Sequence, residues 1–254
     1  MRKIKVVLLR HGESQWNLEN RFTGWTDVNL TKKGEIEAKS SGVLLKQNQY
    51  KFDFVFTSLL KRANQTMRIC LNEMKINNIP IIYNWRLNER HYGALQGLNK
   101  AETAKKYGDK QVLLWRRSYN TSPPLLELED ERHPKFDLKY QNLQQNELPR
   151  GECLKDTVDR VTPLWKNNIV PKILSGQKIL IVAHGNSLRA IVKILDQISN
   201  EEIIDLNIPT GIPLVYELDN KLNPIKHYYI GDSALITEKT IAITNQGTSD
   251  YDSF

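Results

Sequence analysis

Two short apolar runs, each ending at a His-Gly pair, constrain the fold of this chain more than any other feature. The first run covers 4–9 and leads to His11, and the second covers 179–183 and leads to His184. β-branched runs of this length are typical of buried strands, so each histidine is expected where a strand ends. Ligands of open α/β sheets bind beyond the carboxyl ends of the strands, so we expect the two imidazoles side by side. One could then act as a nucleophile and the other as a charge-stabilising neighbour.

The rest of the chain alternates between strand-like and helix-like segments. Further strands are expected at 52–57 and 79–83, with a hairpin of 214–218 and 225–230 near the end. Helices are expected at 31–47, after the strand that ends at Thr57, from Asn99, from 109 to 117 and from about 152. The polar stretch 13–26 is typical of an active-site loop. This alternation predicts one α/β domain, 1–254.

One segment, 118–150, shows neither the two-residue period of a strand nor the 3.6-residue period of a helix. It is polar and contains prolines, and a stretch of this length inside a compact protein is typical of a lid, a binding loop or a linker. We therefore expect an inserted loop and helix subdomain there. We also expect a C-terminal tail over about 234–254.

Composition places few limits on the function. The 254 residues are 40% hydrophobic, which is enough for a sizeable core. No apolar run approaches the roughly 20 residues of a membrane span, and the chain enters its first strand without a signal-peptide core, so we expect a cytoplasmic protein without membrane contact. Cys70 and Cys153 lack metal-ligand spacing and are expected to be reduced packing thiols. No His-Glu-x-x-His pattern or other clustered set indicates a metal.

The formal net charge of +7 favours an anionic partner. Because the basic residues are dispersed among acidic ones, charge alone leaves nucleic acid, phosphorylated metabolites and an ordinary solvated surface all open. A nucleic-acid binder would need a basic stripe with interleaved aromatic residues, which the sequence lacks. The arginines beside the two histidine motifs favour small phosphorylated molecules.

Five segments, in order along the chain, resemble a known family. They are Leu9 to Ser14, Asn20 to Trp25, Leu87 to Gly93, Leu95 to Lys100, and Ala183 to Arg189. These are similar to the signature segments of cofactor-dependent phosphoglycerate mutases, in the histidine phosphatase superfamily. The resemblance extends from about residue 5 to residue 247. It implies a three-layer α/β/α fold with a mostly parallel sheet, and a homo-oligomer, either a dimer or a tetramer.

The resemblance also implies an activity. It is the interconversion of 3-phosphoglycerate and 2-phosphoglycerate, a step of glycolysis and gluconeogenesis, primed by 2,3-bisphosphoglycerate. His11 would become the phosphohistidine, since a neutral imidazole attacks phosphorus well. Arg10, Arg62 and His184 match the phosphate pocket, where cations and N–H donors replace a metal. Glu89 matches the general acid/base at the substrate hydroxyl. His91 has no evident role and is expected to be structural.

The remaining matched positions are expected to bind the substrate through amide, hydroxyl, backbone or cationic donors. They are Ser14, Asn17, Thr23, Gly24, Arg90, Tyr92, Lys100, Arg116, Arg117, Gly185 and Asn186. Arg116 and Arg117, adjacent at the end of a predicted helix, suit a carboxylate or a second phosphate. Gly24 and Gly185 could instead be turn glycines only.

Two departures from the family pattern qualify these expectations. Cys153 replaces the serine that often follows the glutamate at 152, which affects only local capping. The tail ends in Thr-Ser-Asp-Tyr-Asp-Ser-Phe, where relatives tend to be short and basic. If this tail closes over the site, Asp250 and Asp252 should weaken closure over an anion and give a slower or leakier mutase.

Three alternatives to the mutase stay open. A bisphosphoglycerate mutase or synthase has the same histidines, although that branch commonly carries glycine where Ser14 stands. A broad histidine phosphatase would give the phosphoryl group to water. A protein that only binds phosphorylated ligands would have no use for both His11 and Glu89.

Overall fold

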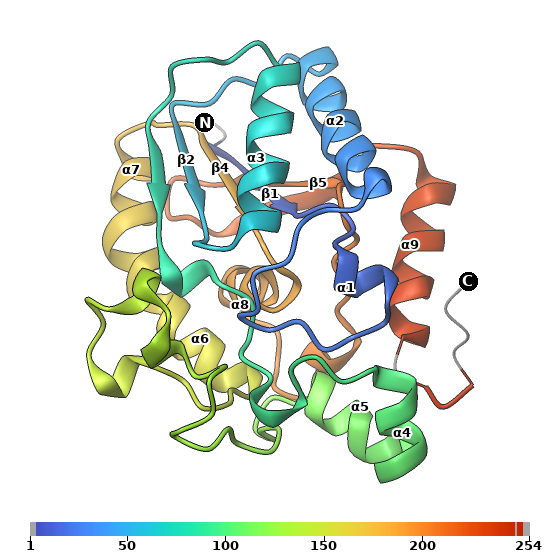
Figure 1. The fold of residues 1–254 in the computed structure, drawn as a ribbon. Helices are drawn as coiled ribbons and strands as arrows, with labels where there is room; N and C mark the ends of the chain where they lie inside the picture. The colour runs from blue at the N-terminus through green and yellow to red at the C-terminus, as the bar shows by residue number, and fades with distance from the viewer. Residues whose placement is uncertain (1–3, 247, 251–254) are drawn as a thin grey trace.

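The computed structural model describes residues 4–246 and 248–250. Its described strands form one six-stranded sheet in the order β3-β2-β4-β1-β5-β6 (Figure 1). The strands are β1 Ile4–Arg10, β2 Phe54–Thr57, β3 Ile81–Tyr83, β4 Ile179–Ala183, β5 Pro213–Leu218 and β6 Pro224–Tyr229. β3, β2, β4 and β1 are parallel, whereas β5 runs antiparallel to both β1 and β6. The prediction of a mostly parallel sheet with a terminal hairpin is confirmed.

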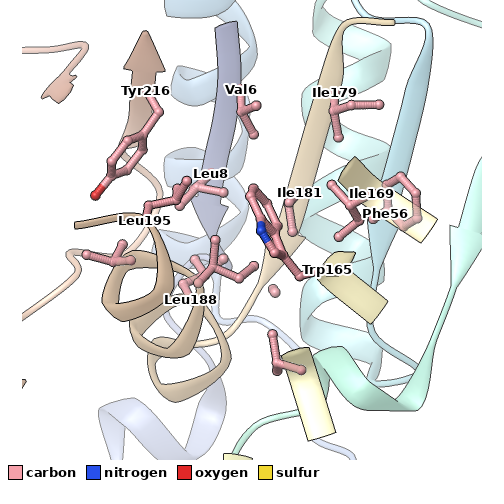
Figure 2. Packing of buried hydrophobic residues seen from close by; sticks show 14 of the residues in the cluster. Val6, Leu8, Phe56, Trp165, Ile169, Ile179, Ile181, Leu188, Leu195 and Tyr216 are labelled. Atoms are coloured by element: carbon pink, nitrogen blue, oxygen red, sulfur yellow. The ribbon is translucent and has the colours of Figure 1, made fainter. Parts of the chain in front are cut away.

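Helices cover both faces of this sheet, and β1 shows why. Successive side chains of a strand point to opposite faces. Val6 and Leu8 enter one hydrophobic cluster with helices α6 (Leu154–Leu164) and α8 (Gly185–Asp196), shown in Figure 2. Val7 and Leu9 enter a second cluster with α2 (Lys32–Gln47) and α3 (Lys61–Glu73). Both clusters are fully buried along β1 and β4. The α/β/α layering is therefore confirmed.

The helices largely follow the predicted order. They are α1 Gln15–Leu18, α2 Lys32–Gln47, α3 Lys61–Glu73, α4 Lys100–Tyr107, α5 Asp109–Arg117, α6 Leu154–Leu164, α7 Val170–Leu174, α8 Gly185–Asp196 and α9 Ser233–Asn245. Thr31 and Asn99 cap α2 and α4 through their side-chain oxygens. These caps explain why both helix starts could be predicted to the residue.

Two local predictions are corrected. The stretch 13–26 is not entirely loop, because Ser14 and Asn17 form a reciprocal capping box that nucleates the short helix α1. The long helix expected from 152 is divided: α6 passes into a wide π turn at Trp165–Ile169 before α7. Pro171, which has no backbone N–H, lies two residues after the end of this turn, at the start of α7.

The segment 118–150 contains only three short 3₁₀ turns, Pro134–Phe136, Leu138–Tyr140 and Gln145–Glu147. It is nevertheless fastened to the domain: Tyr140 is buried against Trp25 and Trp85, and Lys139 forms an ion pair with Asp27 at 2.7 Å. The polar insertion therefore packs on the loops around the carboxyl ends of the strands.

Two further observations bear on the sequence predictions. Cys70 and Cys153 are buried free thiols, as predicted. Among residues 4–246 and 248–250, no helix has both the length and the apolar character needed to cross a bilayer.

Candidate active site

The two strand-end histidines lie side by side, as the sequence indicated. β1 and β4 are adjacent and in register, with Arg10 opposite Ala183, so His11 and His184 leave the sheet together. Their ring centroids are 4.9 Å apart in an edge-on arrangement, and both side chains are buried. The parallel register of two strands therefore builds this pair.

His11 is arranged as a nucleophile. Its Nδ1 donates to the carbonyl of Gly12 at 2.7 Å, which leaves the lone pair on Nε2. Arg62 Nε donates to that Nε2 at 3.3 Å. Burial, followed by the Arg62 and Arg10 cations, holds the pKa of His11 well below its ordinary value. The imidazole is therefore neutral at neutral pH. Its unprotonated Nε2 faces the Arg62 cation, which would bind the incoming phosphoryl group.

His184 lies behind this nucleophile. It caps the start of α8, and its Nε2 lies 2.8 Å from the hydroxyl oxygen of Ser58. Burial, and then the Arg62 cation, hold the pKa of His184 well below its ordinary value. His184 is thus a neutral polar neighbour of His11, and its place in the phosphate pocket stays a prediction.

Arg62 and Arg10 supply positive charge from two different elements. Arg62, in the first turn of α3, donates to the carbonyls of Thr26 at 2.9 Å and Gly24 at 2.8 Å. Arg10, the last residue of β1, donates to the carbonyl of Ile208 at 2.7 Å, and its buried Nε has no partner among the described residues. Backbone carbonyls thus hold both guanidinium groups without neutralising them.

Gly24 and Gly185 differ in what requires a glycine. Gly24 has a φ of +56°, and a Cβ there would lie 2.1 Å from Gln96 Oε1, so both conformation and space demand glycine. Gly185 has no positive φ, and a Cβ there would lie 3.6 Å from Glu89 Oε2 and 3.5 Å from Arg10 Cζ. Gly185 therefore keeps open the space between the acid/base candidate and a phosphate-binding cation.

Glu89 is the carboxylate of the site. Its Oε1 accepts the backbone N–H of Arg90 at 2.8 Å and of Asn186 at 3.1 Å. Burial raises the pKa of Glu89, but the Arg90 N–H and the Arg10 cation outweigh it and hold the pKa below its ordinary value. Glu89 is therefore ionised and ready to accept a proton, while none of the described residues donates a hydrogen bond to its Oε2.

One cavity collects most of the predicted residues. The predicted site residues that line it are Arg10, His11, Asn17, Thr23, Arg62, Glu89, Tyr92, Lys100, Arg116, Arg117, Gly185 and Asn186. The other four predicted residues do not line it, and each acts on a residue that does. Ser14 caps Asn17, Gly24 accepts from Arg62, His184 packs on His11, and Arg90 donates to the hydroxyl of Tyr92 at 3.2 Å.

A second group of cations lies beside the first. Lys100, Arg116 and Arg117 line the cavity together with Arg189, and Arg90 is buried next to them. Burial, and then Arg116, Arg10 and Arg117, lower the pKa of Lys100 well below its ordinary value. Buried Nε atoms of Arg90 and Arg189 have no partner among the described residues. Such unpaired donors are costly, and of the two residues only Arg189 lines the cavity, where it could donate to an anionic ligand.

Six lining residues were not predicted: Arg21, Arg189, Asn207, Ile208, Ile243 and Gln246. Arg21 and Arg189 stand inside the quoted motifs, so their position was a usable signal. Asn207 and Ile208 follow a capping box at Ser199 and Glu202, where the sequence carries no site motif. They reach the cavity only through tertiary structure.

The C-terminal segment forms one side of the cavity through Ile243 and Gln246. Figure 1 shows α9 beside α1 and above α4 and α5. Arg116 and Arg117 donate to the carbonyl of Ile243 at 3.4 and 3.3 Å, and Lys100 donates to Gln246 at 3.3 Å. No described residue of α9 is buried. The helix is therefore held by polar contacts, which include those to the cationic groups and the ion pair of Lys239 with Glu37 at 2.8 Å. In the described part of the chain, no His, Cys, Asp and Glu cluster could hold a metal.

Several solved structures share this fold. A structure named mycobacterial hydrolase 1 superposes with a TM-score of 0.69 and 19% identity, covering 91% of this chain and 100% of that chain. A mycobacterial glucosyl-3-phosphoglycerate phosphatase with VO3 gives 0.64 and 21%, covering 84% and 92%. An alpha-ribazole phosphatase from Shigella flexneri gives 0.61 and 21%, covering 90% and 96%. At such identities the likeness establishes the fold only.

The sequence itself gives the family. It matches the histidine phosphatase superfamily, branch 1, over residues 6–132 and over an overlapping stretch, 125–230. Together these stretches include both histidine motifs and Glu89. The chain belongs to the histidine phosphatase superfamily, branch 1.

Proposed function

We propose that this protein is a 2,3-bisphosphoglycerate-dependent phosphoglycerate mutase. The observation that carries the proposal is the second cationic group, Lys100, Arg116, Arg117 and Arg189, in the same cavity as His11. Arg10 and Arg62 suffice for one transferring phosphoryl group, so the further cations suit a substrate with a second acidic group. A phosphoglycerate carries both a phosphate and a carboxylate.

The chemistry follows from the states of His11 and Glu89. With a phosphoryl group on His11 Nε2, a substrate hydroxyl attacks phosphorus, the P–N bond breaks, and the Glu89 carboxylate takes the hydroxyl proton. This gives 2,3-bisphosphoglycerate. In the return step His11 attacks the other phosphoryl group, the P–O bond breaks, and Glu89 returns its proton to the departing oxygen. Arg10 and Arg62 neutralise charge on the phosphoryl oxygens in both steps.

The comparisons by themselves favour the alternative, a histidine phosphatase, because two of the similar structures are named as phosphatases. The chemistry on the enzyme would be the same until water replaces the substrate hydroxyl. The closed side of the cavity, where Ile243 and Gln246 meet the cations, supports the mutase because it restricts water. A bisphosphoglycerate synthase would release 2,3-bisphosphoglycerate before the return step, so a separate phosphoryl donor would have to phosphorylate His11 again at each turnover.

The test is the conversion of 3-phosphoglycerate by purified protein in the presence of a chelator, with and without catalytic 2,3-bisphosphoglycerate. We expect formation of 2-phosphoglycerate that survives chelation, rises with the bisphosphate and is lost in His11→Ala. The matched control is His227→Ala, a half-exposed histidine on β6 that should keep full activity. Release of phosphate without 2-phosphoglycerate would overturn the mutase in favour of the phosphatase.

Three further elements belong to this proposal: the partners, the location and the oligomeric state. The partners would be small phosphoglycerates, with no nucleic acid, membrane or metal needed. A cytoplasmic location follows from a glycolytic role. A homo-oligomer, dimer or tetramer, stays a prediction from the resemblance, which light scattering of the purified chain would check.

A further inference from the structure

We propose that the buried ion pair Arg160–Glu152, together with the Trp25 indole, positions Glu89 for proton transfer. The inference deepens the proposed function, since it rests on Glu89 as the acid/base residue, whether the acceptor is a substrate hydroxyl or water. None of the three residues lines the cavity, so each acts through Glu89.

Arg160, on α6, is bonded to the backbone of the loop that carries Glu89. Its Nη2 donates to the carbonyls of Asn88 at 3.0 Å and Glu89 at 2.9 Å, and its Nη1 donates to the carbonyl of Arg86 at 2.6 Å. One rigid guanidinium plane therefore fixes three carbonyls within four residues. A lysine ammonium, which has no planar fork, could not reproduce this geometry.

Glu152 holds both the guanidinium and the far side of the same loop. Its Oε1 accepts from Arg160 Nε at 2.6 Å, and its Oε2 accepts from Arg160 Nη2 at 3.0 Å. The Oε2 atom also accepts the backbone N–H of His91 at 2.7 Å, and the Glu152 N–H donates to the His91 carbonyl at 2.8 Å. The pair thus fixes the backbone before and after Glu89.

Trp25 adds a third donor to the acid/base residue itself. Its indole Nε1 donates to the Glu89 carbonyl at 2.7 Å, and the Arg160 guanidinium lies 5.8 Å from its ring centroid. The Glu89 carbonyl therefore accepts two bonds, while its carboxylate accepts the Arg90 and Asn186 N–H groups. Four directed bonds fix the peptide and the side chain together.

Stability alone is a weak reason for such an arrangement. The side chains of Arg160 and Glu152 are 7% and 5% exposed, and a buried ion pair often contributes no more than apolar residues of similar size. Three backbone carbonyls directed at one guanidinium give what an apolar pair could not, a fixed orientation. Proton transfer is sensitive to such placement, and a shift of about 1 Å can cost on the order of a hundredfold in rate.

The first experiment compares Trp25→Phe with Trp85→Phe. The two indoles belong to one aromatic cluster, with ring centroids 6.0 Å apart, but the Trp85 indole N–H donates to none of the described residues. We expect Trp25→Phe to lower kcat roughly tenfold to a hundredfold with little change in KM, and Trp85→Phe to leave both near the parent values. Arg160→Lys should lower kcat at least as much as Trp25→Phe. The activity followed is the parent's own, mutase or phosphate release.

Two readouts separate positioning from a merely structural role. In a Glu89→Gln background, Trp25→Phe should lower kcat no further, because it acts only through the carboxylate. The Glu89 pKa, followed by carbon-13 NMR, should rise in Trp25→Phe and not in Trp85→Phe, since looser N–H donors stabilise the carboxylate less.

Additive losses in the double variant, or an unmoved Glu89 pKa, would overturn the positioning role. If Glu89→Gln itself keeps full activity, the proposed function of Glu89 is wrong instead. The NMR titration reports on the inference even where no phosphoglycerate is turned over.

Discussion

Arg62 Nε donates to His11 Nε2 across 3.3 Å, at the nitrogen left unprotonated by the Nδ1 bond to the Gly12 carbonyl. A guanidinium beside an imidazole disfavours the imidazolium, so the same cation keeps the nucleophile neutral and lies ready for a phosphoryl oxygen. This relationship joins the end of β1 to the first turn of α3, two elements separated by more than forty residues in the chain.

Replacing Arg62 should therefore change the titration of His11. Burial and the two nearby arginines lower its pKa, so His11 should protonate only below its ordinary value of about 6.5. In Arg62→Gln we expect the pKa of His11 to rise, since one of the opposing cations is gone. Nitrogen-15 NMR of the imidazoles measures this directly. Arg68→Gln, an exposed position on the same helix, is the control, and an equal shift there would contradict the assignment.

Glu89→Gln should remove proton transfer while preserving the cavity. The amide has the size of the carboxylate but cannot take up a proton, so kcat should fall by about 10²–10⁴. Affinity for inorganic phosphate should not weaken, because a negative charge leaves a cavity lined by cations. Steady-state kinetics and calorimetry check the two parts. Glu102→Gln, exposed on α4, should behave as the parent, and weaker phosphate binding in Glu89→Gln would refute this account.

Gly24→Ala should damage the phosphate pocket, whereas Gly108→Ala should cost only backbone strain. Both glycines have positive φ, +56° and +87°, but a Cβ at Gly108 meets nothing within 4 Å. At Gly24 the added Cβ displaces Gln96 Oε1, which accepts the backbone N–H of Trp25. It also disturbs the Gly24 carbonyl, which accepts from Arg62.

We expect both variants to lose on the order of 1–3 kcal/mol of stability from backbone strain, since both positions have positive φ and Gly108 combines it with a ψ of 144°. Activity should fall only in Gly24→Ala. We expect a loss of roughly tenfold or more, the size typical of a misplaced binding group. Thermal unfolding and kcat separate the effects. Equal activity losses in the two variants would mean that the clash at Gly24 has no bearing on Arg62.

His91 should make the protein less stable in acid without taking part in catalysis. Burial, and then His133, lower its pKa to about 3, and its Nδ1 accepts the Gly93 N–H. Because the unfolded chain protonates this histidine below about pH 6.5 and the folded chain does not, stability falls as pH falls. Between about pH 7.5 and pH 5.5 the parent should lose about 1.4 kcal/mol more than His91→Gln.

Urea unfolding at the two pH values measures this difference. Other buried histidines, such as His11 and His184, contribute equally to both proteins and cancel. Equal losses in parent and variant would show that His91 does not stay neutral in the fold.

The acidic tail should weaken closure over an anionic substrate. Asp250 lies with Glu238 in a second cavity, which shares Arg10, Ile243 and Gln246 with the site, and Asp252 lies outside the described residues. Asp250→Asn with Asp252→Asn should lower phosphate release relative to mutase turnover by about twofold to threefold, a size typical of exposed charges. The ratio of the two products is the measurement. An unchanged ratio, there and after deletion of 248–254, would reject a role for the tail.

Local sequence patterns and the family resemblance predicted the α/β layers, the carboxyl ends of the strands and most of the residues that line the cavity. The β-branched runs could bury themselves only as strands, and the capping residues Thr31 and Asn99 set two helix starts through local hydrogen bonds. The strand-end pattern indicated His11 and His184, and the resemblance of the motif segments to the phosphoglycerate mutases implied Glu89 and the arginines.

The contacts that hold these side chains in place could not be predicted from the sequence, because they join segments that are distant along the chain. Ser14 and Gly24 support lining residues and do not line the cavity, and Ile243 and Gln246 line it from the C-terminal tail, for which the sequence predicted closure over the site but no individual lining residue. The bonds of Arg160 to three carbonyls depend on α6 lying across a loop more than sixty residues earlier in the chain. Local patterns encode elements and reactive side chains, whereas hydrogen bonds between distant segments form only when packing brings their donors and acceptors together.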